Sequence, residues 1–131
     1  MGFLSAEALF SSSQALPSSG NIVTVNVGVY SDIACTQELN AFGWGEISPG
    51  TSVTHTIYVK NTGNSQVTLS MNAADWSPAE ANGPMTLAWD KEGTTLLPEE
   101  VTTAMLTLSV AQNIVSDITE FSVGIVVTGT A

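Results

Sequence analysis

The sequence predicts an all-β fold, an antiparallel β-sandwich with jelly-roll or Ig-like connections. Apolar and β-branched residues alternate with polar residues in one short segment after another. Clusters of Pro, Gly, Asn and Asp separate these segments, and no long amphipathic helix pattern occurs. The 131 residues suffice for one domain with a real core but not for two. We therefore divide the chain into an N-terminal segment, residues 1–20, and a sandwich domain, residues 21–131.

The N-terminal segment differs from the rest of the chain because it is apolar but interrupted by small residues. If it is extended, one face carries Leu4, Ala6, Ala8 and Phe10. A helical stripe through Phe3, Ala6 and Phe10 fits as well, so the sequence leaves both conformations open. Three consecutive serines, residues 11–13, disfavour a helix interior and thus favour the extended form. Residues 16–20, with Pro17 and Gly20, have the composition of a hinge.

Residues 21–30 form the clearest strand pattern in the sequence. Polar and small residues alternate there with four valines, which we expect on one face: Val23, Val25, Val27 and Val29. A polar connection, residues 31–41, follows this strand. Residues 42–47 then predict a short strand that carries Trp44.

Residues 44–71 are the stretch around which we expect the fold to be organised. A strand over residues 53–60 would place Val53, His55, Ile57 and Val59 on its apolar face. Pro49 and Gly50 predict a tight turn before it, and residues 61–64 (NTGN) predict a loop after it. Alternation then resumes over residues 67–71. The pattern predicts consecutive antiparallel hairpins with one buried and one solvated face.

The second half of the domain continues with short strands. Residues 72–84 read as irregular, residues 85–89 as a strand that ends at Trp89, and residues 90–93 as a turn. Residues 101–110 predict a long strand, residues 111–120 a connection, and residues 121–127 a last strand.

The charge balance excludes several classes of partner. The chain has 12 acidic and 2 basic residues, a net charge of −10, while 44% of its residues are hydrophobic. Nucleic acid and anionic lipid both require a cluster of Lys and Arg, so neither is expected as a partner. No run of 18 apolar residues occurs, so we expect no transmembrane segment. The acidic excess predicts an acidic, threonine-rich outer surface.

No arrangement of residues indicates catalysis, and we predict that the protein is not an enzyme. His55 is the chain's sole histidine, and we expect it to be packed and hydrogen bonded on the apolar face of its strand. Glu99 and Glu100 are neighbours, which would point to opposite faces of a strand. Cys35 is the one cysteine of the sequence, and we expect it to be a small, buried hydrophobic residue.

Metal and carbohydrate sites receive little support, and we assign no metal ligands and no cofactor. The chain lacks the several Cys or His residues of a zinc site. Calcium remains open because carboxylates stand in or near loops, at Asp32, Asp75, Asp90, Glu92, Asp117 and Glu120. The tryptophans are expected in the core, with a carbohydrate platform as the alternative reading of Trp44, Trp76 and Trp89.

Several local motifs together suggest a family. They are residues 27–36 (VGVYSDIACT), 44–53 (WGEISPGTSV), 59–65 (VKNTGNS), 76–78 (WSP) and 87–89 (LAW). In these stretches the chain resembles the archaeal bundling pilins and the related TasA/camelysin-like biofilm fibre proteins. The resemblance implies a jelly-roll-like subunit that is secreted and polymerised into extracellular, cell-surface filaments.

The same resemblance implies a role for the N-terminal segment. It would be a donor strand that inserts Leu4, Ala6, Ala8 and Phe10 into the next identical subunit, with Pro17 and Gly20 as the hinge. The expected partners are identical subunits in a helical homopolymer and neighbouring filaments in bundles. The alternative is a monomeric Ig-like module of a cell-surface protein that mediates glycan- or calcium-dependent adhesion.

Overall fold

The computed structural model describes residues 17–112, 118 and 120–131, and in these ranges the protein is all-β. A single short 3₁₀ turn, η1 (Ala79–Ala81), accompanies the strands in the described ranges. The strands are β1 (Ser18–Val25), β2 (Gly28–Tyr30), β3 (Ala41–Gly43), β4 (Ser52–Lys60), β5 (Val67–Ser77), β6 (Met85–Trp89), β7 (Thr95–Leu96), β8 (Val101–Val110) and β9 (Phe121–Thr130).

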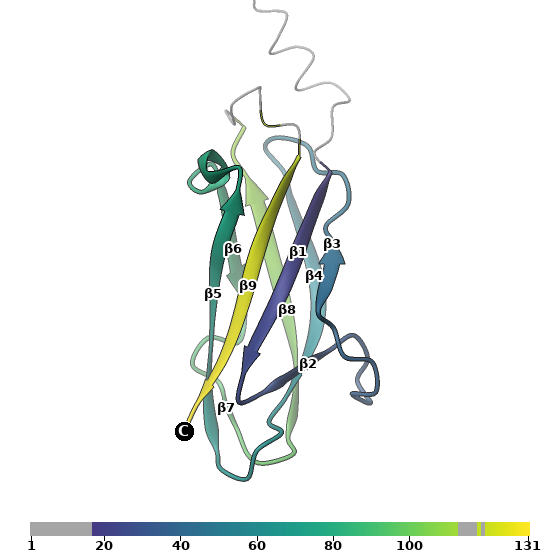
Figure 1. Ribbon diagram of the computed structural model, residues 1–131, viewed down its shortest axis with the longest axis vertical. Coiled ribbons are helices and arrows are strands. Elements are labelled where there is room, and N and C mark those ends of the chain that lie inside the picture. The colour runs from purple at the N-terminus through teal and green to yellow at the C-terminus, as the bar shows by residue number, and fades with distance from the viewer. Residues whose placement is uncertain (1–16, 113–117, 119) are drawn as a thin grey trace, which may run out of the picture.

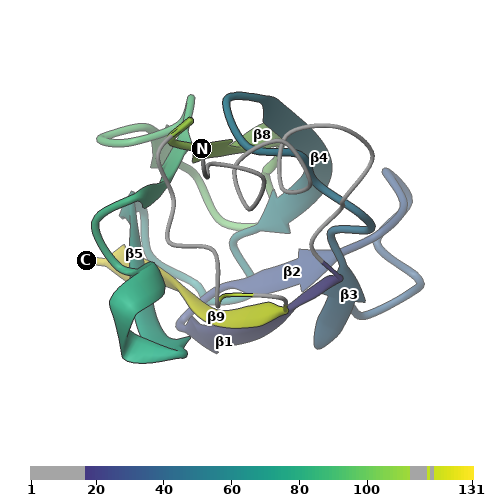
Figure 2. The same ribbon diagram turned by 90° about the horizontal axis from the view of Figure 1, so that it is seen from above.

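The strands form two sheets that face each other as two layers (Figures 1 and 2). One sheet has the order β3-β1-β9-β5-β7 and the other has the order β2-β4-β8-β6. Odd-numbered strands therefore lie in one layer and even-numbered strands in the other, so consecutive strands never pair. The predicted run of hairpins around β4 is wrong: the turns do bend the chain, but each one carries it across to the opposite layer.

The pairing of β1 with β9 corrects the prediction of a wholly antiparallel sandwich. These strands run parallel over eight residue pairs, from Ser18↔Phe121 to Val25↔Thr128. The five-stranded sheet is consequently mixed, whereas every pair in the four-stranded sheet is antiparallel. A parallel pair joins segments far apart in sequence, here the first and last described strands, and local turn signals carry no information on such a pair.

The predicted strand over residues 21–30 is in fact two strands in different layers. Asn26 has a φ of +62°, and this left-handed residue ends β1 and turns the chain toward β2. The alternation changes phase at the turn. Val23 and Val25 are 55% and 43% exposed, while Val27 and Val29 are buried. The prediction of one shared valine face is therefore wrong.

The core fills the space between the layers. The strands predicted at residues 85–89, 101–110 and 121–127 are confirmed. β5 continues to Ser77, so residues 72–77, which we predicted to be irregular, belong to a strand. The sequence does not predict β7. Trp44 is buried, and Trp76 and Trp89 pack against the core, as expected. The largest fully buried side chains come from both layers: Ile47, Ile57, Leu69, Met85, Leu96, Leu106, Leu108, Ile118 and Ile125.

The outer faces of the sheets are not acidic, contrary to the prediction. Within the described strands the one carboxylate is Asp75, at the register shift of β5. The outward positions of β1, β9 and β5 carry Asn, Val, Ser, Thr, Gly and Ala. The other described acidic residues lie in loops and in η1. In the described ranges no helix is long and apolar enough to cross a membrane.

Candidate functional site

The four-stranded sheet is incomplete along one side, beside β4. On that side β2 pairs with β4 only through Tyr58, Val59 and Lys60. The other side of β4 pairs with β8 over the whole length from Ser52 to Lys60. Within the described ranges, residues Ser52–Ile57 thus have no strand beside them on the β2 side. An unpaired strand edge presents main-chain N–H and C=O groups to any segment that can pair with them.

Burial along β4 follows this difference in pairing. Val59 lies in the part of β4 that pairs with β2, and Ile57 directly precedes that part. Both side chains are completely buried. Val53 and His55 occupy the same inward-facing row but remain partly exposed. The core is therefore well covered where β2 accompanies β4, and less covered where β2 has ended.

An aromatic cluster lies at the uncovered part of the core. The His55 ring stacks on Phe42 of β3, with ring centroids 3.9 Å apart and ring planes 9° from parallel. Trp44 packs edge-on against both, at 4.9 Å from Phe42 and 6.2 Å from His55. The cluster bridges the edges of the two layers, because β3 belongs to one sheet and β4 to the other.

Two properties of the cluster bear on its chemistry. Burial lowers the pKa of His55 below its usual value, so the ring is neutral at pH 7. The packed position predicted for His55 is confirmed, whereas the predicted hydrogen bond of its ring is not present among the described residues. The Trp44 Nε1 atom is buried and has no hydrogen-bond partner within the described part of the chain. These side chains form an apolar packing site and not an acid–base pair.

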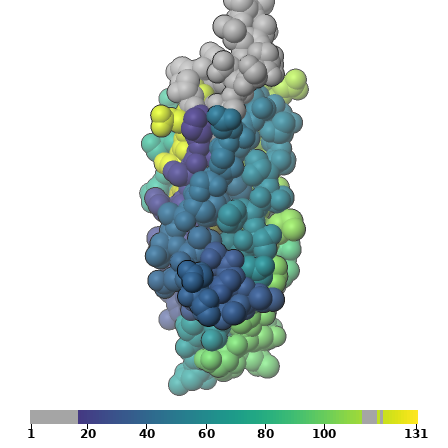
Figure 3. Space-filling view, turned by 90° about the vertical axis from the view of Figure 1, so that its right-hand side faces the viewer, coloured from purple at the N-terminus to yellow at the C-terminus, as the bar shows by residue number. Residues whose placement is uncertain are grey.

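The sheet edge lies beside a loop that covers only its lower part. The chain between β2 and β3 folds back on β2. Leu39 N donates to Val29 O at 2.9 Å, and the main chains of Tyr30 and Glu38 pair as an isolated antiparallel β-bridge. Figure 3 views this side of the molecule, and the blue loop protrudes over its lower half. Beyond that loop, residues 44–51 lead from β3 to Ser52, and their side chains Trp44 and Ile47 are buried.

The predicted hinge residues lie at the start of β1. The Phe121 amide donates to Pro17 O at 3.1 Å, which ties Pro17 to the beginning of β9. Gly20 is buried inside β1, paired with Phe42 on one side and Val123 on the other. Gly20 therefore belongs to the sheet. The predicted donor-strand residues Leu4, Ala6, Ala8 and Phe10 lie outside the described residues.

Three of the loop carboxylates considered for calcium, Asp32, Asp90 and Glu92, accept hydrogen bonds from the protein's own donors. Glu92 accepts from Trp89 Nε1 at 2.8 Å and from Met71 N at 3.1 Å. Asp90 accepts from Met105 N at 2.9 Å, and this bond lowers the pKa of Asp90. Hydrogen bonds from the Thr36 hydroxyl and then Gln37 N lower the pKa of Asp32.

No group of three or more potential metal ligands gathers among the described residues. The carboxylates at Asp32, Asp90 and Glu92 instead complete loops and sheet edges. Asp117, one of the carboxylates considered for calcium, lies outside the described ranges.

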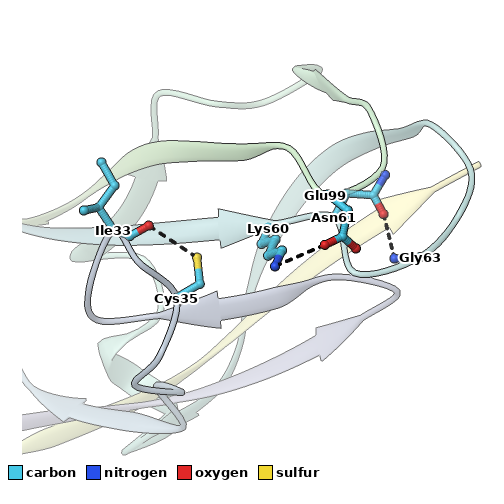
Figure 4. A network of polar contacts seen from close by, with 6 residues as sticks. All are labelled: Ile33, Cys35, Lys60, Asn61, Gly63 and Glu99. Carbon is cyan, nitrogen blue, oxygen red and sulfur yellow. Dashed lines mark hydrogen bonds and ion pairs between the residues drawn. The ribbon is translucent and has the colours of Figure 1, made fainter.

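Cys35 differs from its prediction. It lies in the loop after β2 with a φ of +58° and is partly exposed, so it is not a buried core residue. Its Sγ atom donates to Ile33 O at 3.7 Å, and burial raises the pKa of the thiol. Figure 4 shows it near Lys60, whose ammonium pairs with Glu99 at 3.4 Å.

Asn61 is the structural centre of the loop that joins the two layers after β4. Its side chain is completely buried. Nδ2 donates to Ser65 O at 2.7 Å and to Leu96 O at 3.0 Å. Oδ1 accepts from Gly63 N at 2.9 Å, as Figure 4 shows. The sequence indicated a turn-forming residue here but not these long-range contacts. Their role is structural.

Comparison with known proteins adds no relative. The sequence matches no protein-family model, and none of the curated proteins compared with it is significantly similar.

Proposed function

We propose that the protein is a structural subunit of an extracellular pilus or biofilm-matrix filament, and that copies assemble by donating the N-terminal segment to a neighbour. The observation that carries the proposal is the unpaired half of β4 beside a partly exposed aromatic cluster. The segment that precedes Pro17 offers the complementary feature. It has an alternating apolar pattern and ends at a proline.

Donation to another copy produces a polymer for geometric reasons. The donated segment and the surface that receives it are different parts of the chain, so the contact is heterologous. Each copy that donates a segment still has its own open edge. A contact of this kind does not close on itself unless the rotation forms a ring, and it therefore extends into a filament. Strand addition supplies main-chain hydrogen bonds for affinity and side-chain insertion for specificity.

The topology is compatible with the jelly-roll-like subunit that the resemblance implies. The order β1-β9-β5-β7 lies opposite β4-β8-β6, and every connection passes between the layers. The parallel pairing of β1 and β9 departs from a standard jelly roll. The distribution of charge also suits assembly, since acidic loops keep copies soluble while uncharged sheet faces avoid like-charge contact.

Two matched variants in the N-terminal segment test the proposal. Ala6→Asp places a carboxylate on the face expected to insert, whereas Ser5→Asp makes the same change of charge on the opposite face. Burial of an unpaired carboxylate is strongly unfavourable. We expect electron microscopy to show filaments for the native chain and Ser5→Asp but not for Ala6→Asp. Filaments of equal length for both variants would contradict insertion of this face.

A further inference from the structure

The sheets have four outer edges, and they differ in what they offer to an added strand. β3 and β7 are edges of the five-stranded sheet, with three and two residues. Edges this short make poor templates for pairing. One edge of the four-stranded sheet is β6. The other edge is formed by β2 and, where β2 has ended, by residues Ser52–Ile57 of β4. Because β7 and β3 are so short, β5 from Asn72 onward and β1 from Val23 onward also have no strand on that side in the described ranges. A register shift and the carboxylate of Asp75 interrupt the open part of β5, and the open part of β1 is only the three residues Val23–Val25. We therefore compare β6 with residues Ser52–Ile57 of β4.

The chain itself closes the side of the molecule beside β6. The connection from β5 to β6 passes through η1, where Ala81 is fully buried and Asn82 bridges to Met85. Just beyond β6, the Asp90 carboxylate accepts the Met105 amide of β8 and so extends the pairing past the end of the strand. On the side between β3 and β4 the connecting residues 44–51 bury Trp44 and Ile47, but no strand pairs with Ser52–Ile57 on that side in the described ranges. The inner side chains Val53 and His55 remain partly exposed there.

The dimensions fit the segment at the N-terminus. Six residues of strand are about 20 Å long, and sixteen extended residues reach about 53 Å at ~3.3 Å each. A donated segment can therefore cover the open edge and still leave residues for the link to Pro17. The segment is long enough to reach a second copy placed against the first.

The chemistry of the two faces fits as well. An inserted strand would place its inward side chains beside Phe42 and His55, where apolar and aromatic groups pack well. Its outward side chains would lie beside Thr54 and Thr56, which are exposed and uncharged. The acidic residue Glu7 would thus meet hydroxyl groups and not another carboxylate.

From these observations we infer that residues Ser52–Ile57 of β4 are the acceptor edge, and that they pair with the N-terminal segment of a second copy over the cluster of Phe42, Trp44 and His55. This inference rests on the proposed function. It goes further by naming the edge and the side chains that receive the segment. Val53, His55 and Phe42 would become fully buried only in the assembly.

Disulfide trapping can locate the acceptor edge. In a Cys35→Ser background, a cysteine is placed in turn at Ser5, Glu7 and Leu9 and combined with Thr54→Cys on β4. The matched control combines the same series with Thr86→Cys on β6, because both threonines are exposed residues on edge strands of the same sheet. We expect the Thr54 series, and not the Thr86 series, to give a ladder of covalent oligomers on a denaturing, non-reducing gel.

The outcomes separate this inference from the proposed function. Filaments that cross-link through Thr86, or through neither position at any register, would overturn the assignment to β4 while leaving donor-strand assembly in place. A Cys35→Ser parent that forms no filaments, when the native chain also forms none, would overturn the proposed function itself. A disulfide confined to monomers in the Thr54 series would show that the segment pairs within its own copy, and this would overturn exchange between copies.

Discussion

Replacing Asn61 should destabilise the domain far more than replacing an exposed asparagine of the same loop. The Asn61 side chain holds three segments together: the loop at Gly63 and Ser65, strand β7 at Leu96, and the end of β4. Its main chain adds two bonds to the turn before β8, with Glu100 O at 3.0 Å and Glu99 N at 2.8 Å. Asn61→Ala keeps the main-chain bonds and removes the three side-chain bonds.

The expected loss follows from those three bonds. A typical hydrogen bond contributes about 1 kcal/mol net, and a buried partner left unsatisfied costs about 1–3 kcal/mol. Gly63 and Ser65 are exposed and can bind water, but Leu96 is buried and its carbonyl loses its side-chain partner. We therefore expect Asn61→Ala to lower the free energy of unfolding by about 3 kcal/mol. For a chain of this size, that loss lowers Tm by roughly 10 °C.

Urea and thermal unfolding of the full chain, followed by circular dichroism, measure this effect. Asn64→Ala is the matched control, because Asn64 is exposed and makes no side-chain hydrogen bond to the described residues. Its change should stay within about 0.5 kcal/mol. Equal stability of the two variants would refute the conclusion that Asn61 organises this crossing between the layers.

Two further predictions concern His55 and the valines of the first strands. Since burial lowers the pKa of His55 below 6.5, stability should be highest above pH 6.5 and fall as the pH drops below it, because the unfolded chain then binds a proton that the folded state resists. Unfolding at pH 7.5 and pH 5 should reveal the fall, and a His55→Phe variant that keeps it unchanged would contradict this cause. Val27 is buried and Val25 is exposed, so Val27→Ala should lower the free energy of unfolding by about 2 kcal/mol and Val25→Ala by less than about 0.5 kcal/mol. If a urea titration gave similar losses for the two variants, the change of phase at Asn26 would be contradicted.

The sequence predicted the strands better than their partners. Alternation located β4, β6, β8 and β9, because period-two burial is a local property that each segment carries by itself. It could not show that β4 and β5 lie in opposite layers. A turn such as residues 61–64 bends the chain in either case, and the bond from Asn61 to Leu96 O, which ties the end of β4 to the opposite layer, cannot be read from the turn.

The phase change at Asn26 illustrates a second limit. Four alternating valines look like one face, and a single left-handed residue moves two of them to the outside. Asparagine tolerates this conformation, but it does so in only some of its occurrences. The pairing of β1 with β9 was equally hidden, because nothing within either strand specifies a parallel neighbour about a hundred residues away.

The candidate site was predicted only in part. His55 was correctly placed as a packed residue, yet its stacking on Phe42 depends on the edges of two different sheets meeting. The open half of β4 follows from the early end of β2 at Tyr30, where the chain folds back on itself through Glu38 and Leu39 and no longer runs beside β4. The prediction that the N-terminal segment inserts into a neighbour remains a prediction.

Deletion of residues 2–16 tests the central proposal most directly. The core of the domain comes from Ile22 onward, so the shortened chain retains the residues that fold it. We predict that the intact chain forms filaments in negative-stain electron microscopy, and that the shortened chain, folded by circular dichroism, remains as single particles. Filaments from the shortened chain would contradict assembly through the N-terminal segment.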